Sequence, residues 1–147
     1  MVDIPPDVQI RATLRPGAVC YFPEETFNTV VPHYFVVLNH QPLTDQSVVL
    51  ICASSQVDNV RRRTRRFPGT LVELSLTDYR DFSAPITAFD GNAVLTKSVS
   101  ELIAKLRDGN LKMKTEMPPA IVARLREAVL ASPTVDRKTK AILQASD

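Results

Sequence analysis

The fold is decided by residues 33–53, which read HYFVVLNHQPLTDQSVVLICA. Both ends of this stretch are continuous apolar runs rich in β-branched and aromatic residues, which is typical of strands covered on both faces. Between them, residues 39–46 include Asn, Pro and Asp, and these residue types favour turns. The sequence therefore predicts two central strands, at 33–39 and 47–53, joined by a hairpin-type connection.

Short β runs separated by turn residues continue on both sides of this hairpin. Because short connections place successive strands next to each other, we expect one strongly curved antiparallel sheet. The predicted strands are 18–22, 33–39, 47–53, 70–75, 85–89 and 92–97.

After residue 97 the apolar residues recur at helical spacing. Ser98 and Glu101 form a capping box at the start of the first predicted helix, and Gly109 offers a stop at its end. A second helix is expected between about 118 and 132, because proline is tolerated in a first turn. A short third helix is expected over about 134–145.

The chain has 147 residues, of which 44% are apolar and 23% are charged, so it can bury one continuous core without disulfides or metal. We expect a single domain over 1–147. It is predicted to consist mainly of β-structure, with a strand-rich barrel over about 14–97 and a helical C-terminal part over about 98–145.

The formal net charge is only +2, so no global field compels nucleic-acid binding. Cys20 and Cys52 lie in apolar runs without Cys-x-x-Cys spacing, which predicts buried, reduced thiols.

The N-terminus lacks a charged leader ahead of an apolar core, and no apolar stretch approaches the ~20 residues that cross a bilayer. We therefore expect a cytoplasmic protein with no membrane partner. No metal-ligand spacing or Gly-rich phosphate loop is found, so neither a metal nor another cofactor is expected.

Six segments follow one another in an order and at a spacing that occur together in one protein family. They comprise a strand opened by Gly17 and closed by Pro23, a second main strand, a strand ending in Ser-Ser-Gln, the strand after it, a strand with an acidic residue, and a C-terminal helix. In chain order these segments are residues 14–23, 33–39, 51–56, 69–74, 88–92 and 114–129. With this pattern the chain resembles the PemK/MazF family of toxin-antitoxin ribonucleases over most of residues 14–130.

The resemblance implies an SH3-like barrel that cleaves single-stranded RNA without metal, forms a homodimer and is inhibited by a partner antitoxin. In active family members an arginine near the start of the second main strand stabilises charge at the cleaved phosphate, and Tyr34 follows His33 at that place here. A second arginine, two residues before the acidic position in some members, is Ala88 here. A pentavalent phosphate needs a positioned cation or several strong donors, so another group must supply the charge.

Asp90 and His33 are the candidate catalytic residues. Asp90 can accept the 2′-hydroxyl proton of RNA, and His33 can act as a general acid or base or donate to a phosphate. Each residue also has a simpler interpretation. Asp90 begins an Asp-Gly-Asn sequence that is typical of turns, and a histidine at a strand start can bond to nearby backbone.

The candidate RNA-binding residues are two hydroxyls and a basic run. Ser54 and Ser55 can hydrogen-bond the scissile phosphate, although strand-end hydroxyls more commonly satisfy local backbone groups. The basic run, predicted as a loop, contains Arg61, Arg62, Arg63, Arg65 and Arg66. A guanidinium matches the geometry of phosphate, so one of these arginines can replace the missing catalytic cation while the others hold the RNA backbone. The alternative is a solvated, mobile loop.

Aromatic residues near the basic run can offer base-stacking faces to single-stranded RNA, although aromatics in β runs more often belong to the core. These residues are Tyr21, Phe22, Phe27 and Tyr34. Two functions thus remain open from the sequence. The first is a metal-independent endoribonuclease toxin, and the second is a catalytically inactive barrel that binds RNA or a protein partner.

Overall fold

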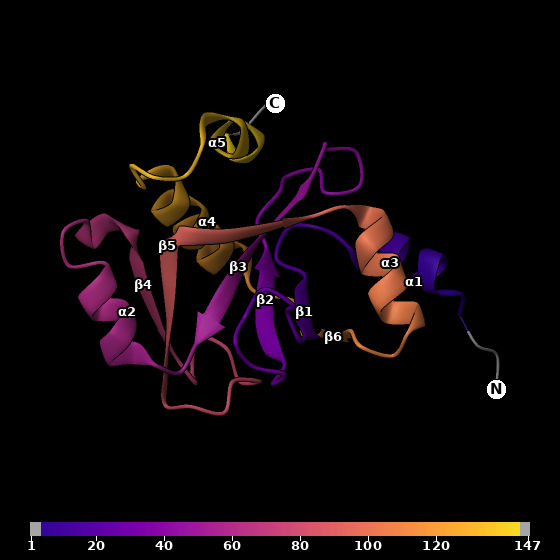
Figure 1. The fold of residues 1–147 in the computed structure, drawn as a ribbon, viewed down its shortest axis with the longest axis horizontal. Helices are drawn as coiled ribbons and strands as arrows, with labels where there is room; N and C mark the ends of the chain where they lie inside the picture. Colours follow the sequence, from indigo (N-terminus) through magenta and orange to yellow (C-terminus); the bar gives the residue numbers. More distant parts are fainter. Residues whose placement is uncertain (1–3, 145–147) are drawn as a thin grey trace.

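The computed structural model describes residues 4–144, in which six strands form one antiparallel sheet (Figure 1). The strands are β1 (Val19–Phe22), β2 (His33–Val37), β3 (Val48–Ser54), β4 (Leu71–Ser75), β5 (Ile86–Lys97) and β6 (Lys112–Lys114). Their order across the sheet is β4-β5-β3-β2-β1-β6. The predicted antiparallel sheet is confirmed, and the β2–β3 hairpin lies at its centre.

The sheet is open, so the expected closed barrel is not formed. In the part of the chain that the structure describes, β4 pairs only with β5, and β6 pairs only with β1. The strand that would have to meet β4 is β6, which has only three residues, Lys112–Lys114, at the opposite end of the sheet order. The fold is therefore a mixed α/β architecture in which helices cover the sheet.

Five helices accompany the sheet over residues 4–144: α1 (Pro6–Thr13), α2 (Val57–Arg63), α3 (Val99–Arg107), α4 (Pro119–Leu130) and α5 (Arg137–Leu143). The last three confirm the predicted C-terminal helices. Both hydrogen bonds of the predicted capping box between Ser98 and Glu101 are present. The segment 114–129 is only partly helical, because Lys114 belongs to β6 and the helix begins at Pro119. None of these helices is long and apolar enough to span a membrane.

The first two helices were not predicted. α1 begins with Pro6 and buries only Ile10, so it has little apolar periodicity. α2 takes up part of the arginine run that was predicted as a loop. The negative charge of Asp58 in the first turn and the positive charges of the arginines in the last turn interact favourably with the helix dipole. Val60 is buried beneath the helix. These arginines are therefore held on a helix.

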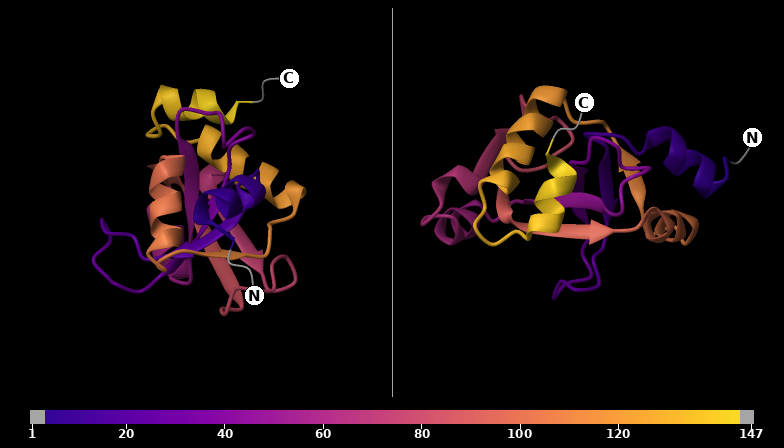
Figure 2. Two further views of the ribbon diagram at one scale, coloured as in Figure 1. Left: turned by 90° about the vertical axis from the view of Figure 1, so that its right-hand side faces the viewer. Right: turned by 90° about the horizontal axis from the view of Figure 1, so that it is seen from above.

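Two hydrophobic clusters lie on opposite faces of the sheet. On one face, α4 and α5 pack their apolar residues, including Leu125 and Val129, against the sheet. On the other face, Ile10 of α1 and Leu102 of α3 pack against strand residues that include Phe35. Figure 2 shows α3 and α4 on opposite sides of the sheet, with the β1–β2 connection projecting from the same side as α3.

β5 bends sharply in its middle, as Figure 1 shows. Its partner β3 advances by two residues from Ile51 to Ala53, while β5 moves from Val94 to Phe89. At this bend α4 packs directly on Gly91, where a Cβ atom would lie 2.4 Å from the carbonyl oxygen of Ala128. The predicted strands 85–89 and 92–97 are thus one bent strand. Asp90 lies within this strand, so the turn interpretation of its sequence is wrong.

Both cysteines are free thiols. Cys20 is buried and Cys52 is half-buried, which confirms the prediction fully for the first and partly for the second. Burial raises the pKa of each thiol to about 12. Neither side chain is therefore a ready nucleophile at neutral pH.

Candidate functional site

A hollow of about 580 Å³ opens on the sheet between α2 and the β1–β2 connection. Its floor comes from β2, β3 and β5. Four of the predicted site residues line it, although they come from separate elements: His33, Ser54, Arg63 and Asp90. The fold thus brings both candidate catalytic residues together with one of the two serines and one of the five arginines.

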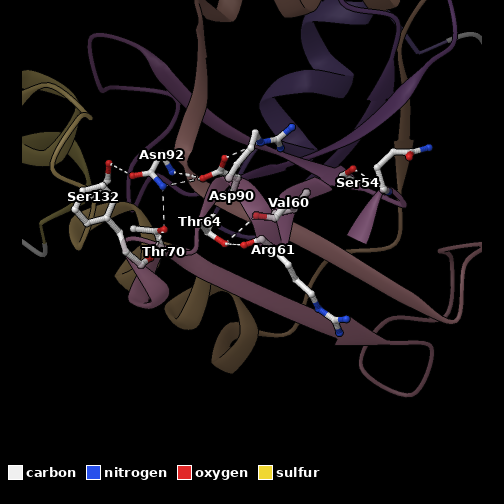
Figure 3. Close-up of polar contacts among 11 residues, drawn as sticks. Ser54, Val60, Arg61, Thr64, Thr70, Asp90, Asn92 and Ser132 are labelled. Carbon is white, nitrogen blue, oxygen red and sulfur yellow. Dashed lines mark hydrogen bonds and ion pairs between the residues drawn. The ribbon is translucent and has the colours of Figure 1, made fainter. Parts of the chain in front are cut away.

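Asp90 lies at the bend of β5 and is only 8% exposed. One carboxylate oxygen, Oδ1, accepts hydrogen bonds from the backbone N–H and the side-chain Nδ2 of Asn92, each at 2.9 Å. The other oxygen, Oδ2, lies 3.3 Å from Nε of Arg63. Asn92 therefore holds one oxygen of the carboxylate (Figure 3), while the second oxygen lies next to the guanidinium of Arg63.

Asn92 was not among the predicted site residues. Besides its two bonds to Asp90, its Nδ2 donates to Oγ1 of Thr70 at 2.9 Å, and its Oδ1 accepts from Oγ of Ser132 at 2.6 Å. Ser132 follows α4 and is fully buried. Figure 3 shows its contact with Asn92. One feature of the sequence could have indicated Asn92: it follows Asp90 by two residues, and residues two apart on a strand face the same side.

Arg63 reaches the hollow from the last turn of α2, with its side chain 57% exposed. Only its Nε contacts Asp90. A guanidinium carries five N–H donors in a planar fork, so the terminal nitrogens can bind an anion while Nε stays with the carboxylate. This arrangement provides a cation beside the buried carboxylate.

The other four arginines do not share this position. Arg61 makes two short hydrogen bonds to Glu73 of β4, at 2.6 and 2.7 Å, and these bonds lower the pKa of that carboxyl group. Arg62, Arg65 and Arg66 are exposed, and Arg66 lies over the ring of Phe67. The basic run therefore divides into a structural arginine, a site arginine and three surface arginines.

His33 begins β2 and is half-buried, with its ring edge-on to Phe27 at 5.2 Å. Its Nδ1 is enclosed but has no hydrogen-bond partner among residues 4–144. The interpretation that this nitrogen bonds to nearby backbone is thus not supported. His33 does line the hollow, so a group bound there can contact this residue.

The two serines point to different surroundings. Oγ of Ser54 accepts a hydrogen bond from the backbone N–H of Gln56 at 3.1 Å, as expected for a strand-end hydroxyl. The Ser54 hydroxyl retains its own proton, which it can donate into the first hollow. Ser55 lines a separate, neighbouring hollow.

The described residues contain no group of three or more potential metal ligands. Comparison of the sequence with models of known protein families gives no match, and comparison with curated proteins gives none either. What the site can do therefore follows from its own chemistry: a buried carboxylate, an imidazole, a hydroxyl and a guanidinium around one hollow are suited to proton transfer at a phosphate ester.

Proposed function

We propose that this protein is a PemK/MazF-like endoribonuclease that cleaves single-stranded RNA without a metal ion. The observation that carries the proposal is the convergence of His33, Ser54, Arg63 and Asp90 on one hollow. These residues supply proton acceptors, proton donors and a cation, which are the groups that metal-independent cleavage of a phosphodiester needs.

In the proposed reaction, Asp90 accepts the proton of the ribose 2′-hydroxyl. The 2′-oxygen then attacks phosphorus, and the bond from phosphorus to the 5′-oxygen of the next nucleotide breaks. His33, in its protonated form, donates a proton to that leaving oxygen. The products are a 2′,3′-cyclic phosphate and a free 5′-hydroxyl.

Arg63 provides the charge that Tyr34 and Ala88 do not. Its terminal nitrogens neutralise the phosphate oxygens while Nε remains with Asp90, and the Ser54 hydroxyl adds a donor. The surface arginines Arg62, Arg65 and Arg66 bind the flanking RNA backbone. As the resemblance implies, we further propose that the curved sheet is a variant of the family barrel and that the active form is a homodimer blocked by an antitoxin.

The direct test is cleavage of a mixed-sequence RNA by purified protein in EDTA, with the cyclic phosphate detected by mass spectrometry. Asp90→Asn should lower the rate by ~10²–10⁴-fold, because it removes the general base. Asp58→Asn is the matched control, since Asp58 is a highly exposed carboxylate on α2. Absence of cleavage by the wild-type protein, freed of any antitoxin, would overturn the proposal.

The second candidate is an inactive module that binds RNA or a protein. Tyr34 and Ala88 favour it, because they stand where active relatives carry arginine. If the module binds RNA, replacing Arg62, Arg65 and Arg66 with glutamine should reduce the slope of log affinity against log salt by about 1 for each lost phosphate contact. An unchanged slope would show that these arginines do not bind RNA.

A further inference from the structure

A second hollow, of about 260 Å³, adjoins the first. The two hollows share His33 and Ala53 in their linings, and the adjacent serines divide between them, Ser54 lining the first and Ser55 the second. The lining of the second hollow comes from the start of β2, the end of β3 and the β4–β5 connection. Figure 1 shows these segments at the same end of the sheet. Phe35 of the first hollow and Tyr34 of the second belong to the clusters on opposite faces of the sheet, so the two hollows meet only at the sheet end. An extended ligand passes from one to the other around that end, beside His33.

One side of the second hollow is aromatic. Tyr21 and Tyr34 are cross-strand partners on β1 and β2, with ring centroids 4.6 Å apart, and the ring of Phe82 lies edge-on to Tyr34 at 5.3 Å. The Tyr34 hydroxyl donates to the carbonyl oxygen of Asp81 at 3.1 Å, which fixes the orientation of the ring. Aromatic faces of this kind stack on planar heterocycles.

The remainder of the lining includes polar residues. Ser55 and Thr87 contribute hydroxyl side chains, which can both donate and accept hydrogen bonds. A nucleobase combines a flat face for stacking with a polar edge for hydrogen bonding, so it matches both parts of this lining. An aliphatic peptide side chain would make no hydrogen bond to these hydroxyls.

We propose that the second hollow is a nucleobase subsite. It binds one base of an RNA strand whose scissile phosphate lies in the first hollow, next to His33. The assignment rests on the proposed function for the position of the phosphate. It also gives Tyr34 a role: the residue at the arginine position of the family contributes a stacking surface, while Arg63 contributes the charge.

The test uses short RNAs in which one nucleotide at a time, on either side of the cleaved bond, is made abasic. For the wild-type protein, one abasic position should lower kcat/KM by about 5- to 150-fold, the range expected for loss of one stacked base. Tyr34→Leu should cause a similar loss on intact RNA and little further loss on that abasic RNA. Phe67 is an exposed aromatic residue outside this lining, so the Phe67→Leu variant should cleave all the RNAs as the wild type does.

A second variant, Ser55→Ala, tests the same subsite if Tyr34→Leu does not fold. Ser55 is exposed, so Ser55→Ala should leave the thermal unfolding temperature unchanged and alter the relative rates on RNAs that differ only in the base at the sensitive position. If RNA is cleaved but both variants keep the wild-type base preference, the subsite is wrong while the proposed function stands. If no RNA is cleaved, binding of a 2′-deoxy oligonucleotide decides: weaker binding by Tyr34→Leu supports the subsite, and equal binding overturns it.

Discussion

Asn92 donates two hydrogen bonds to the same oxygen of Asp90, one from its backbone and one from its side chain, both 2.9 Å long. The other Asp90 oxygen is thereby turned toward Arg63 and the first hollow. Asn92 in turn is held by Ser132 and Thr70. A buried polar network of this kind fixes one orientation, because each member would lose hydrogen bonds in any other.

We expect Asn92→Ala to lower the cleavage rate by about 10- to 100-fold with little change in KM, because a small displacement of a catalytic group is costly while RNA contacts persist. It should also destabilise the fold by about 1–3 kcal/mol, since the side-chain hydrogen bonds that join Asn92 to Thr70, Asp90 and Ser132 are lost. Rates and urea unfolding measure the two effects. Asn59→Ala, on the exposed side of α2, should change neither. Unaltered cleavage by Asn92→Ala would show that Asp90 needs no such support.

Arg63 and Arg65 are exposed arginines two residues apart, but only Arg63 lines the first hollow. Arg63→Gln should reduce kcat by about 100-fold or more, as expected when a donor to the developing phosphate charge is removed. Arg65→Gln should mainly weaken RNA binding at low salt. Single-turnover cleavage at saturating protein separates the two. Equal losses of kcat in both variants would contradict the assignment of the cation to Arg63.

Glu24 is buried at the start of the β1–β2 connection, with Nζ of Lys97 3.0 Å from its carboxylate. Burial by itself would raise the pKa of Glu24, but a hydrogen bond from Thr26 and the positive charge of Lys97 outweigh it, so the net pKa lies below the usual range. The stability that Glu24 contributes is therefore complete above its ordinary pKa, near 4.5, and is lost as the pH falls through the lower folded-state value.

Glu24→Gln should cost about 3 kcal/mol at neutral pH, because Lys97 is left buried with only the more distant Glu101 nearby. Below pH 4.5 the difference from the wild type should shrink. Urea unfolding between pH 3 and 7 measures both. Glu25→Gln breaks a pair whose carboxylate is largely exposed and should have little effect at any pH. A loss in Glu24→Gln that is constant with pH would rule out the ionised pair as its source.

Gly91→Ala should destabilise the protein by about 1–3 kcal/mol, because the added methyl group would overlap the backbone of Ala128 and push α4 from the bend of β5. The bond between Asn92 and Ser132 should loosen as well, with a fall in cleavage. Gly69→Ala is the control, since a Cβ there meets only the Ala131 side chain at 3.8 Å. Thermal unfolding of the two variants gives the comparison, and equal midpoints would show that α4 can shift without cost.

The sheet and the C-terminal helices were predictable because their signals are local. The runs at 33–39 and 47–53 are continuous and apolar, and Ser98 with Glu101 marks a helix start within four residues. The α2 helix was missed because arginines dominate it and only Val60 is buried. The composition of such a segment resembles that of a solvated loop.

The site was predictable in part for the same reason. His33, Ser54 and Asp90 each lie on or at the end of a strand, so the sequence could suggest them individually. Which arginine faces Asp90 depends on the helical phase of α2, and the role of Asn92 depends on a contact with Ser132 forty residues away. Such long-range relationships have no local signature.

The contact between the bend of β5 and α4 also has a consequence for the order of events during synthesis. When β5 has emerged from the ribosome, His33, Ser54, Arg63 and Asp90 have all been made, but Ala128 and Ser132 have not. The bend then lacks the helix that supports it, and Asn92 lacks its buried partner. Under the proposed function, the nascent chain becomes competent to cut RNA only after α4 and Ser132 have emerged from the ribosome.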